Sequence, residues 1–143
     1  MTKVVLIYGT GSGNTERVAM GIIEGIEAAG AEAVLKKYEG DFIDLSDADA
    51  VLVGSPTYNT KPMPFINNIF EGEQGDQFDG KIGAAFGSFG RDGKAVMAIT
   101  EKMKGRSMDV IDPGLPIFAR PDEGKLEECR KFGMDVVSKI NEK

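Results

Sequence analysis

Short apolar runs alternate along this chain with segments whose apolar residues recur at helical spacing. Runs at residues 3–8 and 50–54 predict buried strands, 31–38 predicts an edge strand, 81–87 a fourth strand, and 108–111 with 116–118 an interrupted fifth. Helical spacing follows at residues 14–29, 62–70, 94–104 and 126–140. This alternation predicts a parallel sheet with helices on both faces.

The residue types present exclude several kinds of chemistry. The 143 residues include no His, no Trp and a single Cys. Without His there is no Ser-His-Asp or Cys-His pair and no ordinary zinc site, and one Cys makes neither an intramolecular disulfide nor an iron–sulfur ligand set. We therefore expect no catalytic side chain and no metal, and we expect any redox chemistry to come from a bound cofactor.

The length and charge of the chain further limit which class of protein it can belong to. The length predicts one domain, residues 1–143. Seventeen basic against 23 acidic residues give a net charge of −6, which argues against nucleic-acid binding. The apolar runs are far shorter than the ~18 residues of a membrane span, and the N-terminus has no signal-peptide pattern. We expect a cytoplasmic protein that binds neither nucleic acid nor a membrane.

The loop after the first strand, residues 9–15 (GTGSGNT), has the composition of an anion site. Its glycines and hydroxyls precede a predicted helix, whose backbone N–H groups and dipole favour negative charge. It contains no Lys or Arg, and Asn14 stands where a P-loop requires Lys and a dinucleotide fingerprint its third glycine. Neutral donors of this kind favour a terminal phosphate monoester, although an ordinary capped turn is the alternative.

Two further loops should lie at the same sheet edge, because parallel strands end together. The second loop carries Tyr58 between Pro56 and Pro62, and the third carries Phe89 between Gly87 and Gly90. An aromatic ring in each loop could sandwich a flat ligand ring. For either aromatic taken alone, packing is the simpler explanation.

With these loops, the sequence resembles the flavodoxin family over essentially the whole chain. The resemblance is carried by Asn14 and Thr15 after the first turn, by GSPTY at residues 54–58 and by GSFG at residues 87–90. It implies a three-layer flavodoxin-like α/β fold: a five-stranded parallel sheet of order 2-1-3-4-5 with helices on both faces, and noncovalently bound flavin mononucleotide (FMN). The short path from the fifth strand to the last helix resembles short-chain flavodoxins. The second and third loops are also similar to the flavodoxin domain of flavodiiron proteins.

The resemblance implies a role as well as a fold. Flavodoxins shuttle low-potential electrons between redox proteins through the semiquinone/hydroquinone couple of the flavin, docking transiently with a reductase or other donor and with an acceptor. The diiron module of flavodiiron proteins has no counterpart in this sequence. We therefore expect a free-standing, monomeric electron carrier.

Carried over by position, the resemblance also implies the cofactor-binding residues. The phosphate would be held by Thr10, Gly11, Ser12, Gly13, Asn14 and Thr15. The ribityl chain and one side of the flavin would be lined by Ser55, Pro56, Thr57, Tyr58, Asn59, Thr60 and Lys61, and the other side by Gly87, Ser88, Phe89, Gly90, Arg91 and Gly93. Many flavodoxins have Trp and Tyr where Tyr58 and Phe89 stand, and flavodiiron relatives often show an aromatic where Arg91 stands. Which ring would stack on which flavin face is left open.

The charges are unevenly distributed. Nine acidic residues lie in two blocks, 39–49 and 71–79, which we expect on the solvated surface, the second block on the side away from the flavin. The two loops that flank the flavin carry Lys61, Arg91 and Lys94 against Asp92. This distribution argues against an acidic docking face of the usual flavodoxin kind.

Other functions fit the sequence less well. A phosphorelay receiver domain shares the strand order but requires acidic residues after the first and third strands, where Tyr8-Gly9-Thr10 and Gly54-Ser55 stand. A small FMN-dependent NAD(P)H:quinone-type reductase remains the main alternative, although such enzymes usually have longer chains. A maturation module that has lost its flavin is a third possibility, and the intact phosphate loop argues against it.

Overall fold

The computed structural model describes residues 2–9, 13–57, 66, 68–90 and 92–142. Six strands are described in chain order: β1 (Lys3–Tyr8), β2 (Glu32–Lys37), β3 (Ala50–Gly54), β4 (Ile82–Phe89), β5 (Asp109–Val110) and β6 (Leu115–Phe118). They form one sheet of order β2-β1-β3-β4-β5, in which β6 pairs with β4 and every described pair is parallel. The predicted order is confirmed, and the interrupted fifth strand consists of β5 and β6.

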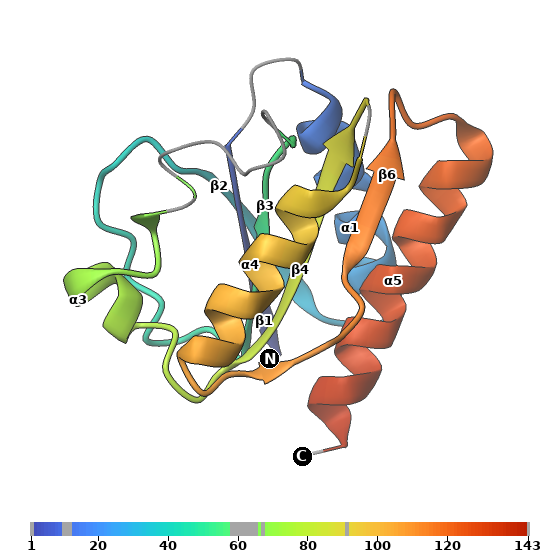
Figure 1. Ribbon diagram of the computed structural model, residues 1–143. Coiled ribbons are helices and arrows are strands. Elements are labelled where there is room, and N and C mark those ends of the chain that lie inside the picture. The colour runs from blue at the N-terminus through green and yellow to red at the C-terminus, as the bar shows by residue number, and fades with distance from the viewer. Residues whose placement is uncertain (1, 10–12, 58–65, 67, 91, 143) are drawn as a thin grey trace.

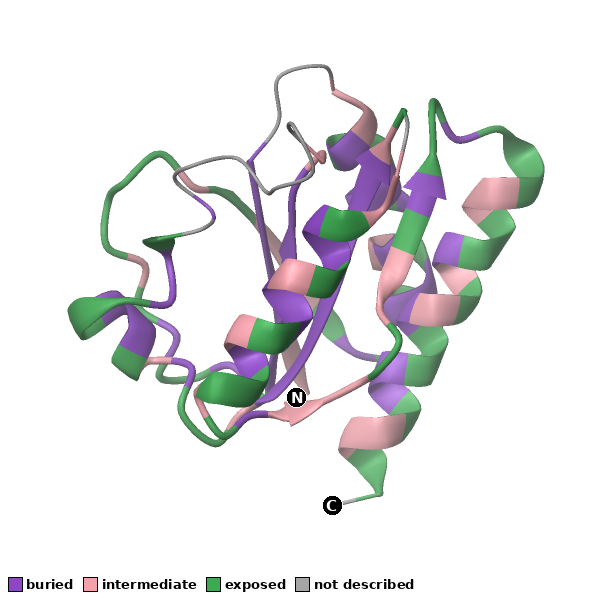
Figure 2. Ribbon diagram, viewed as in Figure 1, coloured by how far each residue is buried: buried purple, intermediate pink, exposed green. Residues whose placement is uncertain are grey.

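Four described helices flank this sheet (Figure 1): α1 (Asn14–Ala28), α3 (Gly72–Asp76), α4 (Lys94–Gly105) and α5 (Glu123–Asn141). In β1, Val4 and Leu6 pack with the residues of α1 and α5, whereas Val5 and Ile7 pack with those of α4. This alternation follows from the two-residue period of a strand. Because β1 is buried on both faces (Figure 2), the predicted three-layer arrangement is confirmed.

Helices α1 and α5 approach each other through glycines. A Cβ on Gly25 would lie 1.9 Å from the Arg130 carbonyl oxygen, and one on Gly133 would lie 2.1 Å from the Ile22 carbonyl oxygen. The two backbones are therefore in direct contact, and α5 fixes the position of α1. Helix α1 ends near Gly30, which has a φ of 89°, as the sequence predicts.

Strand β4 extends two residues beyond the predicted end at Gly87. Residues 86–89 pair with residues 115–118 of β6. The added pairing places Ser88 and Phe89 in the strand, where the sequence predicts a loop. The glycines on either side conceal this extension, since glycine is a poor strand former.

The two acidic blocks, residues 39–49 and 71–79, lie against each other. The Gln74 side chain accepts from the Ile43 N–H at 2.6 Å and donates to the Ile43 carbonyl at 3.0 Å, and Gln77 accepts from the Leu45 N–H at 2.9 Å. All nine acidic residues of the two blocks are exposed, as predicted, although helix α3 lies inside the second block. In Figure 1 α3 lies at the side of the sheet, away from the ends of β4 and β6.

The helix predicted at residues 62–70 and the expected absence of a membrane span can be compared with the structure only within the described residues. Most of the helix predicted at 62–70 falls outside them. Of the helices that are described, none is long and apolar enough to cross a membrane.

Candidate cofactor site at the carboxyl edge of the sheet

The first predicted loop leads into the N-terminus of α1. Gly13 is the N-cap residue, with a φ of 87° that favours glycine, and as a glycine it supplies no side-chain cap of its own. The Gly9 N–H donates to the Gly54 carbonyl at 3.1 Å, which ties the end of β1 to that of β3. Thr10, Gly11 and Ser12 lie outside the described residues. The described end of this loop has the backbone of an anion site.

Thr15 joins the first and third predicted loops. Its side chain is fully buried, and its Oγ1 lies 2.8 Å from Ser88 Oγ, either hydroxyl being able to donate. These two predicted site residues are 73 positions apart in the chain. The start of α1 is therefore fastened directly to the end of β4.

The second predicted loop is fastened to β4 and to α4. The Thr57 N–H donates to the Ser88 carbonyl at 3.0 Å, and Thr57 Oγ1 accepts from the Ala95 N–H at 3.2 Å. The Ser55 N–H donates to the Phe86 carbonyl at 3.2 Å, and the Ser55 hydroxyl donates to the Pro56 carbonyl at 2.8 Å. Tyr58, Asn59, Thr60 and Lys61 lie outside the described residues.

Gly87 keeps the second and third segments close together. A Cβ on this residue would lie 2.1 Å from the Ser55 carbonyl oxygen. The close approach of the β4 backbone to the backbone at Ser55 therefore requires a glycine at this position. At Gly90 a Cβ would meet no atom within 4 Å, and Arg91 lies outside the described residues.

Phe89 is packed against another aromatic residue. Its ring centroid lies 5.6 Å from that of Phe118 in β6, with the planes tilted by 54°. Phe118 is 53% exposed, and the Lys125 ammonium lies 5.3 Å from its ring centroid. Gly93, the N-cap of α4, lies next to this aromatic pair: a Cβ on Gly93 would lie 3.7 Å from Phe89 Cδ1 and 3.0 Å from Pro116 Cβ. Phe118 falls in the strand predicted at residues 116–118 but not among the predicted site residues, and its only signal is an aromatic at the end of that strand.

Burial raises the pKa of two residues. It raises the pKa of Tyr8, at the end of β1, with Glu16 adding to the effect. Burial also raises the pKa of the Cys129 thiol to about 11, which fits a small hydrophobe of the α5 core. Across the part of the chain that is described, His, Cys, Asp and Glu form no group that could hold a metal ion.

The comparisons with known proteins agree with this geometry. Residues 6–133 match the flavodoxin family model, and the chain belongs to the flavodoxin family. A flavodoxin from the domain Archaea superposes with a TM-score of 0.91 at 34% identity, covering 98% of this chain and 99% of that one. Flavodoxins are FMN flavoproteins, and the flavodoxin domain is an electron-transport domain.

Longer relatives contain the same domain. A nitric oxide reductase of Moorella thermoacetica is 32% identical over 96% of this chain, which spans 36% of the relative's length. The flavodiiron protein of Giardia intestinalis superposes with a TM-score of 0.87 at 28% identity, covering 99% of this chain and 36% of the other. The chain thus spans about a third of such relatives.

The described residues are compatible with FMN. The N-cap of α1 is a glycine, which has no side chain, and such an end suits a phosphate bound by backbone N–H groups. The ends of β1, β3 and β4 are joined by Gly9, Thr15 and Thr57, which brings described parts of all three predicted loops to one edge.

Proposed function

We propose that this chain is an FMN-binding electron carrier that shuttles low-potential electrons between a donor and an acceptor protein. The observation that supports it most is the joining of three strand ends at one edge, through the Thr15–Ser88 hydroxyl contact and the bond from Thr57 to Ser88. Bound FMN would supply the one-electron chemistry. The protein's part is to hold the cofactor and leave one edge of it open to a partner.

Each segment has a distinct role in this proposal. Residues 10–15 bind the phosphate with neutral donors, residues 55–61 line the ribityl chain and one side of the ring, and residues 87–91 with Gly93 close the other side. Thr15 and Ser88 are buried, so we assign their side chains to holding the first and third segments together. Phe89 supports this side of the site through Phe118.

The match to an archaeal flavodoxin along nearly its whole length supports the carrier. The nitric oxide reductase matches this chain over only 36% of its own length, so the activity of that reductase is not carried over to this chain. We infer that electrons reach and leave this chain through separate proteins. Cytoplasmic location and a monomeric state remain predictions.

An electron-transfer assay distinguishes the carrier from an NAD(P)H:quinone-type reductase. The FMN-loaded protein is mixed with NADPH and a quinone, with and without a separate flavodoxin reductase, and with cytochrome c as a protein acceptor. We expect cytochrome c reduction only when the reductase is present, increasing with the concentration of this chain. Rapid NADPH oxidation by this chain and the quinone alone would instead establish the enzyme.

A further inference from the structure

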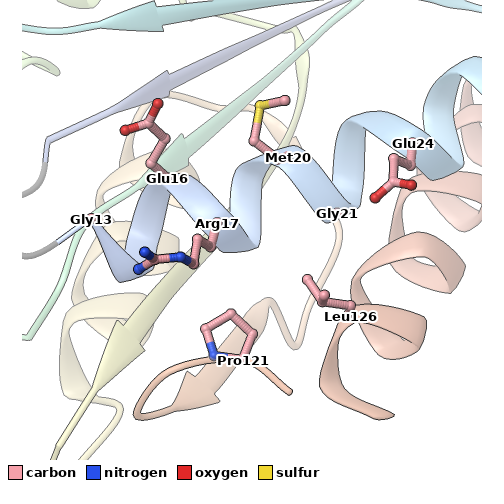
Figure 3. A pocket seen from close by; sticks show the side chains of 8 residues that line it. All are labelled: Gly13, Glu16, Arg17, Met20, Gly21, Glu24, Pro121 and Leu126. Carbon is pink, nitrogen blue, oxygen red and sulfur yellow. The ribbon is translucent and has the colours of Figure 1, made fainter. Parts of the chain in front are cut away.

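Arg17 lies beside a phosphate loop that contains no cation of its own. Residues 9–15 include neither Lys nor Arg, whereas a phosphate monoester carries about −1.5 to −2 charges at pH 7. Arg17 follows the loop by less than one helical turn. In Figure 3 its side chain lies toward the Gly13 end of α1, while Glu16 points to a different side.

Two distances place the guanidinium at the start of the helix. Arg17 Nη1 donates to Asn14 Oδ1 at 3.2 Å. The same nitrogen lies 3.7 Å from the position that a Cβ on Gly13 would occupy. The positive charge is therefore beside the residues that would meet the phosphate.

The acidic neighbours of Arg17 do not neutralise it. Glu16 and Glu24 line the same cavity of about 380 Å³, together with the apolar Met20, Pro121 and Leu126. Glu24 pairs with Arg130 at 3.6 Å, and none of the ion pairs found among the described residues includes Arg17. The side chain makes a neutral hydrogen bond to Asn14 and keeps its charge available to a ligand.

The bond to Asn14 also orients that side chain. An amide carries its acceptor and donor groups on separate branches, so an oxygen that faces Arg17 turns the NH₂ group away from the guanidinium. Asn14 is the first residue of α1, next to Gly13. In this orientation Arg17 determines where Asn14 can donate.

We propose that Arg17 is a positioning residue for the phosphate of FMN: it fixes the Asn14 amide and supplies the positive charge that the loop lacks. The inference rests on the proposed function, since it requires the phosphate to bind at this helix N-terminus. It makes Arg17 a determinant of preference for the phosphorylated flavin over riboflavin, which lacks the phosphate.

The test is to titrate the apoprotein with FMN and with riboflavin, following flavin fluorescence. For Arg17→Ala we expect FMN affinity to fall about 5-fold, as for one exposed charge-assisted contact, and riboflavin affinity to stay the same. Arg17→Lys should recover part of the FMN affinity, and added salt should narrow the gap between wild type and Arg17→Ala. Lys131→Ala, at an exposed position of α5, is the matched control and should leave both affinities unchanged.

Two results would overturn the inference. One is an unchanged ratio of FMN to riboflavin affinity in Arg17→Ala, including the case in which both affinities fall together. The other is strict additivity of Asn14→Ala and Arg17→Ala in the double variant, because a residue that acts through Asn14 must lose part of its effect when Asn14 is absent. A wild-type protein that binds no FMN would instead contradict the proposed function itself.

Discussion

The substitution Gly133→Ala should destabilise the protein, although alanine ordinarily favours a helix over glycine by about 1 kcal/mol. The new methyl group would lie 2.1 Å from the Ile22 carbonyl oxygen and 2.9 Å from the Ile26 nitrogen, both in the backbone of α1. The helices must separate to accept it, and overpacking of this kind costs about 1–3 kcal/mol. Since the helix preference of alanine offsets about 1 kcal/mol of this cost, we expect a net loss of up to about 2 kcal/mol in the free energy of unfolding.

Gly124→Ala is a matched control in the same helix. A Cβ at Gly124 would meet only Asp122 Oδ1, at an ordinary contact distance of 3.6 Å. Stability should therefore stay unchanged or rise by up to about 1 kcal/mol. Urea unfolding of the apoproteins, followed by far-UV circular dichroism, measures both variants. If Gly133→Ala proves as stable as Gly124→Ala, the direct backbone contact between α1 and α5 is refuted.

Three other predictions concern other parts of the structure. Ser88→Ala should lower the free energy of unfolding by about 1–2 kcal/mol, because it leaves the buried Thr15 hydroxyl without its partner. The double variant with Thr15→Val should lose less stability than the sum of the two single variants, and additive losses would contradict this. Arg106 donates to the Phe70 carbonyl at 2.9 Å and pairs with Asp76 and Asp79. Arg106→Leu should therefore lower the free energy of unfolding in urea by about 1–2 kcal/mol, whereas Arg120→Leu, at an exposed site, should leave it nearly unchanged. Equal losses in the two variants would show that these Arg106 contacts do not stabilise the fold. Because burial raises the Cys129 pKa from 9.0 to about 11, the folded state favours the neutral thiol, and its stabilisation is present below pH 9 and lost as pH rises toward 11; Cys129→Ala should flatten this part of the pH profile of urea unfolding, and an unchanged slope would count against it.

The sequence predicts the sheet well because its signals are local. A continuous apolar run such as Val4 to Ile7 is buried on both faces, and the two-residue alternation supplies one side chain to each helical layer. Gly30 marks the end of α1 because its φ of 89° suits glycine. Even the break between β5 and β6 is visible, since Pro113 and Gly114 interrupt the apolar pattern.

Contacts between distant residues are not accessible in this way. Nothing near Thr15 in the sequence indicates that its hydroxyl meets that of Ser88. Gly87 belongs to a predicted cofactor loop, and its sequence neighbours do not show that a Cβ there would lie against the Ser55 carbonyl oxygen. The two acidic blocks are joined by Gln74 and Gln77, which a count of charges does not include.

The central claim, that FMN binds where β1, β3 and β4 end, is tested most directly by amide NMR shifts of the apoprotein during FMN titration. We predict saturation at one FMN per chain, with the largest shifts at Gly13–Thr15, Ser55–Thr57 and Gly87–Gly90. Residues at the opposite sheet edge, such as Asp49 and Lys81, should be unaffected; they line a separate cavity there. Shifts concentrated at that opposite edge, or no saturable binding, would contradict the account.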